Sequence, residues 1–141
     1  MDALLDKASE YCKTHKLRLT DPRLEVLKII ASASKPIGAY DILEKLGKTL
    51  DNPKPPTVYR AIEFWQEHHF IHRIESLNSY VSCTAGHQHK GSQFMICNDC
   101  GDVAEAHLCE LPKSLQETTD KSTFKPERWN FEIHGLCGKC T

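Results

Sequence analysis

Two Cys-x-x-Cys pairs constrain the fold of this 141-residue chain more than any other feature of its sequence. The first pair is Cys97 and Cys100, the second is Cys137 and Cys140, and a glycine follows or interrupts each of them. A two-residue spacing lets both thiolates of a pair bind one ion from a tight turn, where glycine supplies the backbone freedom. Together the pairs provide the four thiolates of a closed tetrahedral zinc site, which predicts a structural zinc ion.

The stretch between Cys100 and Cys137 is too long for one compact zinc ribbon. We therefore expect zinc to clip together the two ends of a small folded unit, whose core alone would be thin. No coordination position stays open, so this zinc should not be catalytic. A thiol–disulfide switch, or two unrelated turns, are the other readings of the same four cysteines.

The rest of the composition favours a cytoplasmic protein. The N-terminal residues, Met1 to Asp6, are acidic at once and lack the basic-then-apolar order of a signal peptide. No segment is long and apolar enough to span a bilayer, so we expect no membrane partner. In a reducing compartment, the seven cysteines indicate metal or redox chemistry rather than a disulfide framework.

Hydrophobic periodicity and turn residues divide the chain into an N-terminal helical part and a C-terminal mixed part. Thr20 is a predicted helix N-cap, and the prolines before Thr57 fit the start of another helix. The expected helices are 3–16, 20–32, 40–46, 57–67 and 111–121, and the expected strands are 70–74, 80–83, 93–97, 103–108 and 129–133.

Four helices followed by a β-hairpin predict a winged helix-turn-helix, in which helix 57–67 enters the major groove and the hairpin is the wing. A small α+β domain without a DNA role has the same pattern. We therefore predict an α+β chain with a winged-helix domain at 1–83, a hinge at 84–92 and a small α/β domain at 93–141. The net charge of −1 shows no bulk basic character, so DNA binding would depend on a few well-placed cations.

Several motifs in order resemble the ferric uptake regulator family, and most closely its zinc uptake regulator branch. They are Arg18-Leu19-Thr20, Arg23–Leu27, Ala39–Leu43, Lys54–Ala61, Phe70–Ser76, Asn78–Val81, Cys97–Gly101 and His134–Cys137. The resemblance implies a homodimeric repressor that binds double-stranded operator DNA when loaded with zinc and controls zinc uptake genes. It implies that residues 93–141 form the dimerisation domain, and that no small molecule is a substrate.

The resemblance also implies a second, regulatory zinc site, so two zinc ions per protomer. Its ligands would be His72 on the wing, Cys83 after the second wing strand, a hinge histidine and Glu105. His89 is the expected hinge ligand, with His87 as the alternative because the hinge length differs, and His107 is an outside candidate on the strand of Glu105. One thiolate, two imidazoles and one carboxylate suit tetrahedral zinc.

The same resemblance places the DNA contacts on two helices. Arg60 lies opposite the apolar face of its helix and can reach guanine edges. Tyr40 and Tyr59 would contact bases, thymine methyls or phosphates, and Thr57 could bind a phosphate at the helix N-terminus.

Three alternatives remain open at this point. An iron or peroxide sensor of the same family would prefer nitrogen and oxygen ligands, which Cys83 disfavours. A zinc-stapled interaction module without sensing would not need the motif Pro55–Arg60 followed by a hairpin. An enzyme is disfavoured because a zinc deaminase needs His-x-Glu and Pro-Cys-x-x-Cys, and here Ile96 precedes Cys97 while no histidine has glutamate two residues later.

Overall fold

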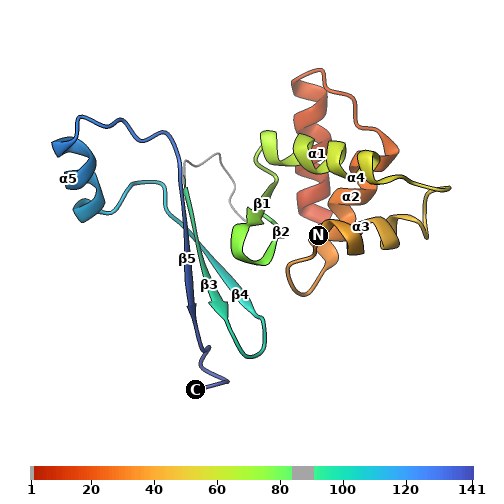
Figure 1. The fold of residues 1–141 in the computed structure, drawn as a ribbon. Helices are drawn as coiled ribbons and strands as arrows, with labels where there is room; N and C mark the ends of the chain where they lie inside the picture. The colour runs from red at the N-terminus through yellow and green to blue at the C-terminus, as the bar shows by residue number, and fades with distance from the viewer. Residues whose placement is uncertain (1, 84–90) are drawn as a thin grey trace. The chain divides into compact units, whose positions relative to one another are not determined.

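The computed structural model describes residues 2–83 and 91–141, except for the side chain of His107. The chain forms two compact units, Met1–Thr84 and Ala85–Thr141. Within the described residues, five α-helices and two small sheets confirm the predicted α+β class (Figure 1). The exact domain limits and the hinge stay predictions, since residues 84–90 lie outside the described ranges.

The N-terminal unit begins with α1 (Asp2–Thr14), α2 (Asp21–Ser32) and α3 (Ala39–Leu46). Thr20 caps α2 as predicted, because its side chain accepts a hydrogen bond from the Arg23 backbone N–H at 3.4 Å. The indole of Trp65, on the fourth helix, donates to the Arg23 carbonyl at 2.7 Å, and the Arg23 guanidinium lies 3.9 Å from the Phe64 ring centre. These contacts fix the fourth helix against α2.

That fourth helix, α4 (Pro55–Glu67), begins two residues earlier than predicted. The difference arises because proline lacks only an N–H that the first turn does not use, so Pro55 and Pro56 can be helical themselves. Val58, Ile62 and Trp65 are buried, as the helical spacing indicated. The opposite face of α4 is exposed to solvent.

The wing consists of β1 (Ile71–Ile74) and β2 (Ser79–Ser82), which pair antiparallel around a 3-10 turn at Glu75–Leu77. An isolated bridge joins Ile37, just before α3, to Tyr80 through hydrogen bonds of 3.1 and 2.8 Å. The connection between α2 and α3 therefore braces the wing against the helices.

In the C-terminal unit, three strands form a sheet in the order β4-β3-β5: β3 (Gly91–Cys97), β4 (Val103–His107) and β5 (Trp129–Gly135). β3 pairs antiparallel with β4 and parallel with β5. The strand β3 begins at Gly91, inside the range 84–92 that we expected to be hinge, because the Gly91 position already pairs with Trp129. Glycine has a low strand propensity, so the sequence contained no sign that the strand begins at Gly91.

A single helix, α5 (Lys113–Lys121), connects β4 to β5 and has no buried residue. Figure 1 shows it beyond the end of the sheet that is opposite the C-terminus. Among the described residues, no helix has the length and hydrophobicity needed to cross a membrane.

A strained residue ends α4 and provides a test of the fold. His69 has a left-handed φ of 64°, at the position after the C-cap where glycine is favoured. We expect His69→Gly to raise the free energy of unfolding by about 1 kcal/mol, because glycine adopts this conformation without the Cβ clash. Urea denaturation measures the change.

Glu63→Gly is the matched control, since Glu63 is exposed in the interior of the same helix. It should lower the stability by about 1 kcal/mol. Equal losses for both variants would contradict the left-handed conformation of His69.

Candidate metal centre and nucleic-acid interface

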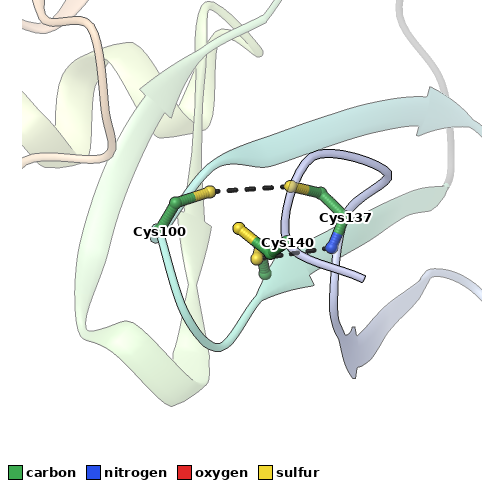
Figure 2. Close-up of side chains that lie close together, drawn as sticks. Cys100, Cys137 and Cys140 are labelled. Atoms are coloured by element: carbon green, nitrogen blue, oxygen red, sulfur yellow. Dashed lines mark hydrogen bonds between the residues drawn. The ribbon is translucent and has the colours of Figure 1, made fainter.

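The two Cys-x-x-Cys pairs meet at one end of the three-stranded sheet. Cys97 ends β3, and a tight turn with Gly101 at φ 78° follows it; the second pair follows β5. All four sulfur atoms lie within 4.8 Å of one another, and those of Cys100 and Cys137 are 3.7 Å apart (Figure 2). Four thiolates at 2.3 Å from a tetrahedral zinc would be about 3.8 Å apart, so the donor set fits that ion.

Hydrogen bonding makes these thiols unequal. The backbone N–H of Cys137 donates to the Cys97 sulfur at 3.4 Å. This hydrogen bond is the largest of the effects that lower the pKa of Cys97 to about 6. The pKa of Cys140 is raised instead, chiefly by the neighbouring Cys137 thiol. The cluster thus favours a thiolate at Cys97 near neutral pH, whereas the raised pKa values of Cys100 and Cys140 keep these thiols protonated there unless a bound cation displaces their protons.

On the wing, the structure brings His72 and Cys83 together. Cys83 follows β2, and its backbone N–H donates to the Phe70 carbonyl at 2.8 Å. Because His72 pairs with Val81, His72 and Cys83 are diagonal neighbours on one face of the hairpin. Their ligand atoms lie within 4.8 Å of each other, and Cys83 is buried. The pair offers one imidazole and one thiol to a metal.

The other predicted regulatory ligands are in the C-terminal unit. Glu105 is on β4, where it pairs with Phe94 and is half-buried. His89 and its alternative His87 lie outside the described residues, as does the side chain of His107.

The predicted DNA contacts come from α3 and α4. Tyr40, in the first turn of α3, is 79% exposed, and Tyr59 on α4 is 52% exposed. Arg60 is exposed beside Tyr59, with its Nε–H donating to the Pro56 carbonyl at 3.3 Å. Thr57 is half-buried, and its backbone N–H donates to the Lys54 carbonyl, so it lies within the first turn of α4.

Sequence analysis missed the residues that order the wing tip. Arg73 donates to the Asn78 side-chain oxygen at 2.9 Å and to Glu75 at 3.4 Å. Asn78 itself has a left-handed φ of 47°. Asparagine next to serine in a short connection was a signal for such a turn, but the hydrogen bond from Arg73 to Asn78 depends on the register of the hairpin.

Comparisons with known proteins agree on one family. The model of the ferric uptake regulator family matches residues 14–134. The zinc uptake regulation protein of Escherichia coli is 39% identical over 139 residues, covering 97% of this chain and 81% of that protein. The peroxide operon regulator of Bacillus subtilis is 24% identical over 140 residues, covering 97% and 93%.

Solved structures give the same result. A zinc uptake regulator complexed with zinc and DNA matches with a TM-score of 0.89 and 38% identity, covering 98% of this chain and 93% of that one. The crystal structure of holo XcZur matches with a TM-score of 0.85 and 33% identity, covering 99% and 97%.

The low pKa of Cys97 predicts how zinc binding at the four cysteines depends on pH. Above about pH 6, Cys97 is already a thiolate in the metal-free protein; below it, zinc must displace one more proton. The plot of log affinity against pH should therefore steepen by one proton as the pH falls through about 6.

Competition with a chromophoric chelator, corrected for the chelator's own protonation, measures this slope. A slope that stays constant through that range would show that the Cys137 N–H does not stabilise the Cys97 thiolate.

Proposed function

The chain belongs to the ferric uptake regulator family, and on that premise we propose that it is a zinc-responsive transcriptional repressor of the cytoplasm. It binds operator DNA as a zinc-loaded homodimer, controls zinc uptake genes and catalyses no reaction. The observation that carries the proposal is the similarity, along nearly the whole chain, to a zinc uptake regulator solved with zinc and DNA.

We assign the structural zinc to Cys97, Cys100, Cys137 and Cys140. Their sulfur spacing supports the assignment, as does the small core of the unit that holds them. Among its described residues, the buried hydrophobic side chains are those of Phe94, Ile96 and Cys97. A metal that joins the β3–β4 turn to the end of β5 would supply folding free energy that so small a core lacks.

The regulatory zinc is assigned to His72, Cys83, Glu105 and a hinge histidine, His89 or its alternative His87. The closeness of His72 and Cys83 on the wing supports this set. A thiol beside an imidazole favours zinc over the harder ions that nitrogen and oxygen ligands select, so an iron or peroxide sensor is the weaker alternative. The lower identity to the peroxide regulator agrees.

DNA recognition is assigned to Arg60, Tyr59, Tyr40 and Thr57. Their support is the exposure of Tyr40, Tyr59 and Arg60, and the packing of the opposite face of α4 into the core. With a net charge of −1, the chain needs contacts of this directed kind, in which arginine can bind a guanine edge through two hydrogen bonds.

Homodimerisation is assigned to the C-terminal unit. Met95 on β3 and Ile133 on β5 are register partners on one sheet face, and they are 48% and 51% exposed. Ala104 on β4 extends this row and is exposed too. An apolar row across a sheet is the kind of surface that a second subunit covers.

Zinc would control DNA binding by restricting conformation. The proposed regulatory ligands come from the wing, the hinge and β4, so one bound ion would link both units. Such a ligand shifts the population toward the orientations that it binds, with a coupling of about 1–3 kcal/mol between zinc and DNA.

Operator-type DNA binding, titrated with free zinc, tests this function. For the wild type we expect affinity to rise roughly 5- to 150-fold with zinc. Cys83→Ser should lose this rise while keeping the structural zinc and the dimer, because serine is a poor ligand for zinc. Cys109→Ser is the matched control, since the exposed Cys109 belongs to neither proposed site.

DNA binding that is equal with and without exchangeable zinc would rule out sensing. The chain would then be a DNA-binding protein whose zinc is only structural. Loss of the response in Cys109→Ser as well would show that Cys83 has no special role.

A further inference from the structure

The indole ring of Trp129, the first residue of β5, packs directly on the backbone of Gly91. A Cβ atom added to Gly91 would lie 1.8 Å from the indole Nε1 and 2.0 Å from Cδ1 of Trp129. The indole therefore occupies the space where any side chain at position 91 would be. Any larger residue there must displace the ring.

The same indole is bound to the end of β4. Its Nε1–H donates to the Leu108 carbonyl at 2.8 Å, and the Leu108 backbone N–H donates to the Gly91 carbonyl at 3.4 Å. Trp129 thus joins the beginning of β5, the beginning of β3 and the residue that follows β4. We call these three residues, Gly91, Leu108 and Trp129, the indole clamp.

The indole clamp and the four-cysteine cluster hold opposite ends of one sheet. The antiparallel β3–β4 pairing places the start of β3 beside the end of β4, whereas the cysteines follow the other ends of β3 and β5. In the sheet order β4-β3-β5, the strand β4 has a single neighbour among the residues that the structure describes. An edge strand of this kind frays unless its ends are fixed.

Glu105 lies on this edge strand, three residues before Leu108. It pairs with Phe94, whereas Trp129 pairs with Gly91, so the two side chains project from opposite faces of the sheet. Trp129 cannot be a ligand with Glu105. It can act on Glu105 only through the backbone of β4.

We propose that Trp129 is a positioning residue for Glu105, through the hydrogen bond that fixes the end of β4. This inference rests on the proposed regulatory zinc site. A carboxylate on a strand held at both ends loses less conformational freedom on binding zinc than one on a frayed edge. The indole clamp therefore raises the affinity of the regulatory zinc and not that of the structural zinc.

Two variants break the clamp in different ways. Trp129→Phe keeps a ring over Gly91 and removes the N–H donor. Gly91→Ala keeps the donor, but its Cβ atom occupies the space of the indole and displaces the ring. We expect each to weaken the second, exchangeable zinc by about 10-fold, the scale of outer-shell effects on metal sites, with the first zinc retained. Asn130→Ala, a change at the exposed neighbour of Trp129, is the control.

A double-mutant cycle with Glu105→Gln separates positioning from general destabilisation. If Trp129 acts through Glu105, then Trp129→Phe has no further effect on the affinity of the second zinc in the Glu105→Gln background. By reciprocity, zinc should slow hydrogen exchange at the Leu108 amide in the wild type, and less in Trp129→Phe. Zinc titration of the dimer of this whole 141-residue chain with a competing chelator gives the affinities.

Each other result overturns the inference in a recognisable way. Additive effects of the two substitutions, or equal weakening of both zinc ions, would show that Trp129 only stabilises the fold. An unchanged second zinc in Trp129→Phe would exclude positioning while leaving the proposed function intact. A wild type without a second zinc, or a Glu105→Gln variant with wild-type affinity, would refute the assigned regulatory site as well.

Discussion

The meeting of four thiols at one end of a three-stranded sheet is the constraint on which the C-terminal unit depends. Its strands β3 and β5 are far apart in the chain, and its helix α5 buries no residue. Few side chains thus hold the sheet together from within. The close sulfur spacing, with 3.7 Å between Cys100 and Cys137, places a cation-binding group where the two strands end. In our account, zinc there fixes the sheet, and the sheet presents Glu105 and the apolar row of Met95 and Ile133.

The N-terminal unit has no such dependence. Its core contains large, fully buried side chains such as Trp65, Leu27 and Ile42, and hydrogen bonds join α4 to α2 and the wing to Ile37. A rigid unit of this kind can hold α4 in a fixed relation to the wing. The proposed regulatory ligands on the wing would then transmit zinc binding to the DNA-reading helix.

The sequence predicted those features whose signals are local. The Cys-x-x-Cys spacing, the Thr20 cap and the helical face of Val58, Ile62 and Trp65 each lie within a few residues, and the structure has all of them. The pairing of Trp129 with Gly91 depends on the register of strands far apart in the chain, and no local pattern encodes it. Resemblance to a family, not spacing, singled out His72 and Cys83, and the hairpin register explains why they are neighbours.

X-ray absorption at the zinc edge, recorded with one and then two zinc ions per chain, distinguishes a structural zinc site from a regulatory one. With one zinc, we expect four sulfur ligands at about 2.3 Å and no nitrogen or oxygen ligand. The second zinc should add a site with one sulfur and with nitrogen and oxygen ligands at about 2.0–2.2 Å. A mixed ligand set for the first zinc, or a second zinc without sulfur, would contradict the division between a structural ion and a regulatory one.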